Sequence, residues 1–468
     1  MKREKELVKN TLIIFIGKIC TQFLSFFLLP LYTKLLDSSQ YGLVDLYTTY
    51  QTLIIYVVYA QIEQAFFRFL IDDRSNENNR KEISSTVITY YLLTSIILGL
   101  IFFIINLIFN IKYCFLLYLM IILCSLTNIL LQYLRGLGDN VGYSLSSFIC
   151  AISTVIANVI FLIYFHFGAN GMLIGCIVGY IFSIIFMLFR TKLFRYYGFK
   201  FYNFITMKKL LLYSLPLIPN ALSWWVMSAS DKIVVFIAIG NTANGLLAVS
   251  QKFSTVYSNM YTMFHLSWTE SASLNINEKD CDKFFSDIIN SMIKLFGCIA
   301  IGIILIMPFI FGILIDSSYN FSYNLIPFYI LSAFFNVIQG LYSVVYIALK
   351  KTKEIAKSTV VAAFINLFID IVLIRFVGIY AAVISSIISY FVISVYRYID
   401  IKKYINVPLN IKDIIVLLFL FVISLLNYFY FSKIINAVIL VVMFFICVFI
   451  NKNFIFKIIG IVMKRGHK

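Results

Sequence analysis

Long runs of hydrophobic residues separated by short polar segments make up most of this chain. Each run has about 18 residues or more, which is what a helix needs to cross about 30 Å of hydrocarbon. The runs are continuously apolar, whereas barrel strands are short and alternate between apolar and polar positions, so we predict helices. Fourteen membrane spans are predicted, at 11–35, 43–70, 83–109, 114–134, 143–165, 171–189, 210–239, 246–268, 288–314, 324–349, 358–375, 379–396, 414–431 and 434–450.

The polar segments between these runs carry charge asymmetrically. If the N-terminus is cytoplasmic, the cytoplasmic segments hold 29 of the 38 Lys and Arg residues, and the opposite loops hold Lys112 and Lys433. Cytoplasmic loops of membrane proteins are enriched in Lys and Arg. The asymmetry therefore favours an even number of spans with both termini in the cytoplasm, because a miscounted span would blur it.

The composition agrees with an all-α integral membrane protein. Hydrophobic residues make up 62% of the chain and charged residues 13%, about half the charged share of a soluble domain. The net charge of +17 is spread over short loops, so we interpret it as a topology signal and expect no nucleic-acid partner. The eight cysteines contain no CxxC pair, and we expect no disulfide framework, metal or cofactor.

The chain also repeats itself around its longest cytoplasmic connection. Asn158 and Asn366 each lie deep in a span, and a glycine-containing turn follows each of them, at 168–171 and at Gly378. Both halves start on the same side, so the repeats are parallel, as in some transporters. We predict a six-helix lobe over 1–190, a cytoplasmic linker over 191–209, a second six-helix lobe over 210–400, and a terminal helix pair with a basic tail over 401–468.

Ionisable residues inside the spans are the candidates for function, since a charge at the bilayer centre costs about 2.5–3.5 kcal/mol on insertion scales. Lys34, Asp45, Arg68 and Arg375 lie near span ends, where they can equally well snorkel to the interface. The deeper charges and amides form stripes at helical spacing on several spans of both halves. The candidates for a substrate cavity are Lys18, Gln22, Glu63, Asp231, Lys232, Lys252, Asn366 and Asp370.

Two interpretations of these stripes differ in function. Polar residues can simply bond neighbouring helices, at about 0.6 kcal/mol a pair, or they can line a shared aqueous cavity. The in-span charges are mostly basic, which suits an anionic ligand, and phosphate binds strongly to Lys and Arg. Pro216 and Pro219 each remove a backbone hydrogen bond from one span, so they are candidates for a gate, although kinks without function are also common.

Motifs of enzymes are missing from the sequence. It contains no Walker loop, no GxSxG and no HExxH, so we expect a protein that is not an enzyme. Energy should then come from an ion gradient or from downhill flow of the substrate. Proton or sodium coupling through Glu63, Asp231 or Asp370 is a further hypothesis.

The stretch Tyr213-Ser-Leu-Pro-Leu-Ile-Pro219, the pair Asp231-Lys232 and the motif Asn244-Gly-Leu246 resemble bacterial oligosaccharide repeat-unit flippases. These belong to the Wzx-type branch of the MOP (MATE-like) superfamily. The end of the fourth span, Leu134-Arg-Gly-Leu-Gly138, is a second match, and the resemblance covers roughly residues 5–400. The family commonly has Arg where Lys232 stands, and Lys keeps the charge but loses the bidentate geometry.

This resemblance implies two six-helix lobes arranged as a V around a central cationic cavity. It implies transport of undecaprenyl-pyrophosphate-linked oligosaccharide from the cytoplasmic to the outer leaflet of the bacterial inner membrane, by alternating access. A polysaccharide polymerase and chain-length machinery are the partner proteins that it suggests. Two alternatives stay open, namely a MATE-type ion-coupled exporter of drugs and a membrane polysaccharide polymerase or glycosyltransferase. The first should have a net-acidic cavity, and the second generally needs a sizeable catalytic loop.

Overall fold

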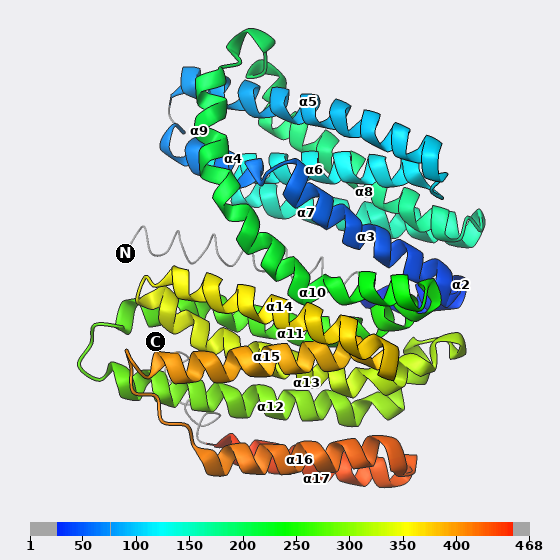
Figure 1. Cartoon of the computed structure of the whole chain (residues 1–468), viewed down its shortest axis with the longest axis vertical. Coiled ribbons are helices and arrows are strands. Elements are labelled where there is room, and N and C mark those ends of the chain that lie inside the picture. The colour runs from blue at the N-terminus through cyan, green and yellow to red at the C-terminus, as the bar shows by residue number, and fades with distance from the viewer. Residues whose placement is uncertain (1–25, 75, 453–468) are drawn as a thin grey trace, which may run out of the picture. The chain divides into compact units, whose positions relative to one another are not determined.

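The computed structural model describes residues 26–74 and 76–452, so Lys18 and Gln22 lie outside the described residues. The chain divides into two compact units, unit 1 (Met1–Lys232) and unit 2 (Ile233–Lys468). Every regular element within the described residues is a helix (Figure 1), which confirms the prediction of an all-α protein. The proposed boundaries at residues 190, 209 and 400 stay predictions.

Unit 1 is built from helices that run back and forth along one another. In chain order they are α2 (Leu29–Leu35), α3 (Ser38–Val58), α4 (Ile62–Asp72), α5 (Glu77–Phe109), α6 (Cys114–Leu137), α7 (Asn140–Val159), α8 (Ala169–Thr191), α9 (Phe204–Ser214) and the first part of α10 (Ile218–Ala238). The core lies where α4, α6 and α8 meet, and it includes the stacked rings of Phe66 and Tyr133.

Unit 2 repeats this pattern of packing. Its helices after the end of α10 are α11 (Asn241–Asn275), α12 (Cys281–Leu314), α13 (Phe321–Ala348), α14 (Thr352–Val377), α15 (Tyr380–Ile401), α16 (Ile411–Tyr430) and α17 (Lys433–Ile450). The pair α14–α15 packs as α7–α8 does in unit 1, and α13 packs on α15 as α6 does on α8. The last two helices pack against α12.

Side-chain caps and turn glycines explain where several helices begin and end. The side chains of Asp37, Asn76 and Asp139 accept hydrogen bonds from backbone N–H groups in the first turns of α3, α5 and α7. Gly168 (φ 56°, ψ −135°) precedes α8, and Gly378 (φ 58°, ψ −134°) follows α14. Both need a backbone conformation that favours glycine, so the two turns that the sequence pairs are alike in geometry.

The number of spans is only partly accounted for by the described residues. Eleven helices are long and apolar enough to cross a membrane, or twelve if α3 and α4, bent by 55°, form one span. The predicted span 11–35 lies largely outside the described residues, and α11 does not meet the criterion despite its 35 residues. Fourteen spans therefore stay a prediction.

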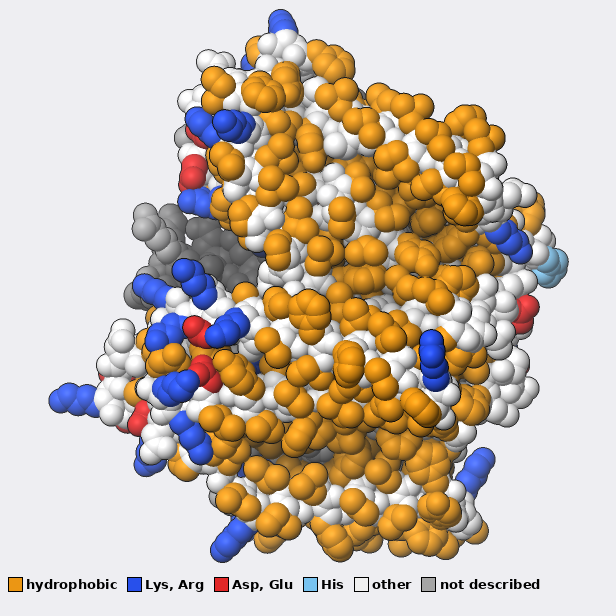
Figure 2. All heavy atoms as spheres, in the orientation of Figure 1, with side chains coloured by type: hydrophobic (Ala, Val, Ile, Leu, Met, Phe, Trp, Pro, Cys, Tyr) orange, Lys and Arg blue, Asp and Glu red, His pale blue; other side chains and the backbone are white. Residues whose placement is uncertain are grey.

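The surface of each unit is that of a multi-pass membrane protein. Figure 2 shows hydrophobic side chains covering the long sides of the helices, while Lys and Arg side chains gather at helix ends. Such large apolar surfaces would aggregate in water, and a bilayer covers them. The opening expectation of an integral membrane protein is confirmed.

Candidate functional site

A polar face of α3 meets α10 within unit 1. Asp45, Thr49 and Thr52 are spaced by three or four residues, so they share one side of α3. The indole N–H of Trp225 on α10 donates to the Thr49 carbonyl at 3.3 Å and to the Thr52 hydroxyl at 3.2 Å. The predicted stripe on this span is therefore an interface between two helices over part of its length.

Lys232 and Asp45 form an ion pair on this face. The ammonium of Lys232 lies 2.8 Å from one Asp45 oxygen and 3.0 Å from the other, and the side chains are 15% and 13% exposed. Removing one partner of a buried pair leaves an uncompensated charge, which costs about 3–5 kcal/mol. Asp45 is thus paired and largely buried within the protein.

Asp231 lies next to this pair in the chain. It is 4% exposed, and one of its carboxylate oxygens accepts the backbone N–H of Lys232 at 3.0 Å. Consecutive residues of a helix point about 100° apart, so the carboxylate of Asp231 and the ammonium of Lys232 serve different faces of α10.

Glu63 stands where the second predicted span is broken. Ala60 and Gln61 adopt left-handed backbone angles (φ 50° and 53°), and the chain restarts as α4 at a bend of 55°. Glu63 is in the first turn of α4 and is 8% exposed. A negative side chain is favoured at this position because a helix N-terminus carries partial positive charge.

The two gating candidates lie at the junction of α9 and α10. Pro216 is within a 3-10 turn at Leu215–Leu217, and Pro219 is in the first turn of α10. The first turn of a helix tolerates proline because its N–H has no partner there. The two prolines explain why this span is interrupted, and their role in gating stays a proposal.

In unit 2, α11 has one polar face and one packed face. Lys252 is half-buried, and Thr255 and Thr262 further along the same face are exposed. The opposite face buries Phe253, Tyr257 and Tyr261, with which the helix packs into the unit. A polar stripe on a membrane helix needs water or another protein surface beside it.

Asn366 and Asp370 are on α14, one turn apart, and are 1% and 0% exposed. The Asn366 amide lies 3.4–3.5 Å from three serine hydroxyls of α15, those of Ser385, Ser386 and Ser389. This stripe therefore joins α14 to α15. Glu63, Asp231 and Asp370 are all buried in this structure, and their place along a substrate cavity stays a prediction.

Arg397 on α15 is not among the residues predicted from the sequence, and it is 0% exposed. Its guanidinium donates to Ser358 (3.0 and 3.1 Å), Thr359 (3.0 Å) and Gln339, so it ties α14 and α13 to α15. No carboxylate among the described residues forms an ion pair with it. The sequence does contain a sign of this role, namely a stripe of serines at helical spacing that ends on Arg397. However, Arg397 follows an apolar run, and a charge at such a place is typical of a loop.

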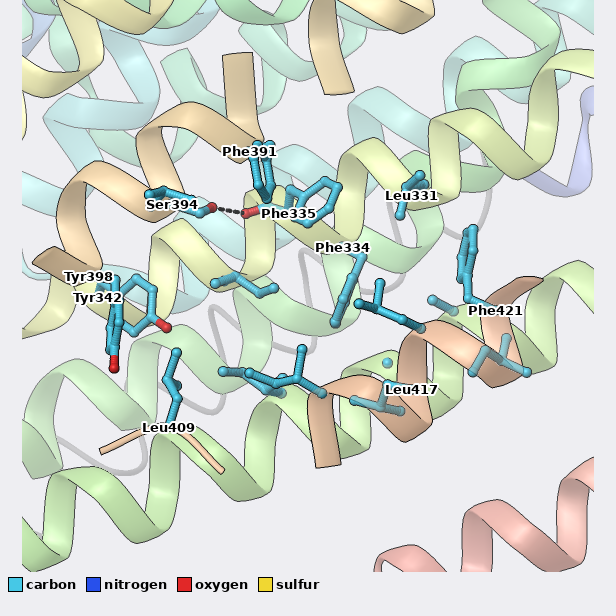
Figure 3. A pocket seen from close by; sticks show the side chains of 18 residues that line it. Leu331, Phe334, Phe335, Tyr342, Phe391, Ser394, Tyr398, Leu409, Leu417 and Phe421 are labelled. Carbon is cyan, nitrogen blue, oxygen red and sulfur yellow. Dashed lines mark hydrogen bonds between the residues drawn. The ribbon is translucent and has the colours of Figure 1, made fainter. Parts of the chain in front are cut away.

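Two further features bear on which ligands fit. Within the described residues no group of His, Cys, Asp or Glu could hold a metal ion. A cavity of about 210 Å³ in unit 2 lies among α12, α13, α15 and α16 (Figure 3). Phenylalanines and leucines line it, and the Ser394 hydroxyl beside it donates to the Phe335 carbonyl at 3.0 Å. Such an apolar wall does not suit a phosphate group.

The fold is that of transporters of the MOP superfamily. The structure of the lipid II flippase MurJ in its inward closed conformation superposes with a TM-score of 0.69 at 18% identity, covering 96% of this chain and 100% of that one. An inward-facing multidrug resistance MATE family transporter gives a TM-score of 0.67 at 10% identity, covering 85% and 95%.

The sequence shows the family to which the chain belongs. Residues 7–268, more than half of the chain, match the polysaccharide biosynthesis protein family, and the chain belongs to that family. No match was found among curated proteins. The resemblance to oligosaccharide flippases of the MOP superfamily is confirmed at the level of the family and the fold.

Proposed function

We propose that this protein is a flippase for undecaprenyl-pyrophosphate-linked oligosaccharide repeat units. It moves them by alternating access from the cytoplasmic to the outer leaflet of the bacterial inner membrane, for surface polysaccharide synthesis. The observation that carries the proposal is the match of residues 7–268 to the polysaccharide biosynthesis family within a fold shared with a lipid II flippase.

The polar face of α3 and α10 supports a role in binding the pyrophosphate. In this structure Lys232 pairs with Asp45, which keeps both charges compensated inside the protein. A pyrophosphate carries more negative charge than one carboxylate and competes for the same ammonium. We infer that substrate binding weakens the contact between α10 and α3, which links occupancy of the site to movement of α10.

A charge swap separates this role from a purely structural one. Lys232→Asp combined with Asp45→Lys restores an ion pair, so the free energy of unfolding should recover relative to either single variant. Transport should stay low, because the cation now stands on α3 instead of α10. Full recovery of transport by the swap would show that Lys232 serves only as a partner of Asp45.

Lys232→Arg is the matched conservative variant. It keeps the charge and supplies the residue that the family commonly has, so transport should be retained. The lysine on the polar face of α11, Lys252, and Asn366 with Asp370 on α14 are proposed as further contacts along the path. Ion coupling through Glu63, Asp231 or Asp370 is tested by collapsing the proton and sodium gradients separately during transport.

The function itself is tested by depleting the protein in its host. We expect lipid-linked oligosaccharide to accumulate on the cytoplasmic leaflet, where an impermeant glycosidase added outside cannot reach it. Re-expression should return the oligosaccharide to the accessible pool. Normal accessibility after depletion would contradict the proposal. A polymerase and chain-length proteins are the proposed partners in the same membrane.

Export of cationic drugs is the second candidate, favoured by the likeness to a multidrug resistance MATE transporter. Inside the predicted spans basic residues outnumber acidic ones, which disfavours a cationic ligand. Increased drug susceptibility after deletion, with normal leaflet distribution of the lipid-linked oligosaccharide, would favour the exporter.

A further inference from the structure

A groove lies on α14 and α15 within unit 2. Its volume is about 220 Å³. Small and branched apolar side chains form most of its wall, and one end carries polar groups. The lining residues are Lys357, Ser358, Val361, Ala362, Ile365, Val392, Ile393 and Tyr396.

Apolar side chains of the groove are open to the surroundings of the protein. Val361 is 52% exposed and Val392 is 37% exposed, while Ala362 and Ile393 form a floor that is 1% and 2% exposed. The small Ala362 between larger neighbours leaves room for a hydrocarbon chain lying along the helices. Since the groove belongs to two membrane-spanning helices, a lipid chain is what it meets in a bilayer.

The polar end of the groove is strongly basic. Lys357 lines it, and Lys353 precedes Lys357 by four residues on the same face of α14. Figure 2 shows Lys and Arg side chains gathered where α14 begins and α15 ends. Neither Lys353 nor Lys357 has an ion-pair partner within the described residues, and Glu354 is the acidic residue beside them.

A third positive charge lies beneath this end. Ser358 lines the groove, and its hydroxyl accepts hydrogen bonds from the buried guanidinium of Arg397 at 3.0 and 3.1 Å. The N–H groups of Arg397 donate to neutral acceptors, so its charge is solvated but not neutralised by a carboxylate of the described residues. A buried charge acts through a medium of low dielectric, and it therefore adds to the potential at Lys357.

We propose that this groove, which we call the α14–α15 groove, binds an anionic phospholipid of the bilayer. One acyl chain lies over Ala362 between Val361 and Val392, and the headgroup phosphate lies at Lys353 and Lys357. Binding of this lipid does not depend on the proposed function. A zwitterionic lipid places a cationic group at the same basic end and binds less tightly.

The test uses the full-length protein in lipid nanodiscs that contain trace phosphatidylglycerol or phosphatidylcholine with a photoactivatable acyl chain. Mass spectrometry then maps the crosslinked peptides. We expect α14–α15 peptides over residues 361–365 and 392–396 to be labelled several-fold more by phosphatidylglycerol. The variant Lys353→Ala/Lys357→Ala should lower phosphatidylglycerol labelling several-fold, to the level of phosphatidylcholine, because these two lysines supply the attraction for the anionic headgroup.

Two controls make the result specific. Lys279→Ala/Lys283→Ala removes the same charge from two exposed residues, one just before α12 and one in its first turn, and should leave the labelling unchanged. Val361→Trp blocks the groove while keeping both lysines, and it should also remove the excess. Equal labelling by the two lipids would overturn the proposal. So would an excess that survives Lys353→Ala/Lys357→Ala, or one that millimolar inorganic phosphate displaces.

Discussion

Unit 1 and unit 2 each contain a trio of helices, α6–α7–α8 and α13–α14–α15, with the same packing but different chemistry at the same positions. Gly168 and Gly378 have nearly identical backbone angles, so positions can be counted from them. Gly175 and Ser385 both stand seven residues after that glycine, and Gly179 and Ser389 both stand eleven after it.

The glycines and serines solve the same packing problem differently. A Cβ at Gly175 would collide with the amide of Asn158, so α7 and α8 approach with backbone against side chain. In unit 2 the amide of Asn366 instead bonds serine hydroxyls. The contact of Gly175 with Asn158 depends on shape, whereas the contact of Asn366 with α15 depends on hydrogen-bond partners that can replace one another.

The two trios differ most in chemistry at the position nineteen residues after the turn glycine. Unit 1 has Met187 there and unit 2 has Arg397, and both are 0% exposed. Met187 fills space among apolar neighbours, whereas Arg397 holds Gln339, Ser358 and Thr359. The two helix trios therefore share a fold, although this position is packed among apolar side chains in unit 1 and belongs to a polar network in unit 2.

Exchanging Met187 and Arg397 between the units should lower the free energy of unfolding most when the change is made in unit 1. Met187→Arg places a charge where the neighbours are apolar, and we expect a loss of about 4 kcal/mol or more in the free energy of unfolding. The measurement is the yield and melting temperature of the purified protein. Met187→Leu is the matched control and should cost less than about 1.5 kcal/mol. A stable Met187→Arg protein would show that unit 1 can also build a polar network.

Gly179→Ser tests whether the close approach of α7 and α8 depends on glycine. A Cβ there would lie 2.8 Å from the Cys150 carbonyl oxygen, which is backbone and cannot rotate away. We expect a loss of about 2–3 kcal/mol from the forced separation of the helices. The reverse change in unit 2, Ser389→Gly, removes one weak interhelical contact and should cost about 0.6 kcal/mol. Equal melting temperatures for the two variants would remove the distinction.

Arg397→Met gives unit 2 the residue of unit 1. Gln339, Ser358 and Thr359 lose a donor, but a buried charge is also removed, so the expected net loss is about 2 kcal/mol. Melting temperature checks it, with Arg397→Lys as the control that keeps the charge without the five donors. No change in Arg397→Met would show that the network contributes little to stability.

The sequence was enough to predict the elements of both trios. The predicted span 114–134 corresponds to α6 (Cys114–Leu137), because a continuous apolar run bounded by polar residues determines where a membrane helix lies. The correspondence between Asn158 and Asn366, and between the turn glycines that follow them, could also be predicted, since these residue types are unusual at depth in a span.

Three-dimensional packing determined what the sequence could not predict. The break in the second span falls at Ala60 and Gln61, which are neither glycine nor proline, so no residue type marks it. Arg397 follows an apolar run, as a topology signal does, and its inward direction depends on acceptors contributed by α13 and α14. The ion pair of Lys232 with Asp45 likewise joins residues far apart in the chain.

The smallest expected effect concerns the ion pairs at the C-terminal ends of α8 and α15. Arg190 and Asp400 both stand twenty-two residues after the turn glycine, with opposite charge. Arg190 bonds Asp139 at 2.5 and 3.0 Å, while Asp400 pairs with Lys403 just after the end of α15 and accepts a hydrogen bond from the Tyr346 hydroxyl of α13 at 2.8 Å. The hydrogen bonds from Arg190 hold the pKa of Asp139 below its usual value, and the bond to Asp400 raises the pKa of Lys403.

Asp139→Asn should therefore change the pH dependence of stability in unit 1. A lowered carboxyl pKa stabilises the folded state above the unfolded value of about 3.9, and that contribution is lost as pH falls through the folded pKa. Because both side chains are about a third exposed, we expect about 0.5 kcal/mol at pH 7. Asparagine still caps α7 at the Gly142 N–H, so the cap stays constant. The melting temperatures of wild type and variant should converge as the pH drops below about 4, and a constant difference would show that the cross-helix pair does not titrate as the structure implies.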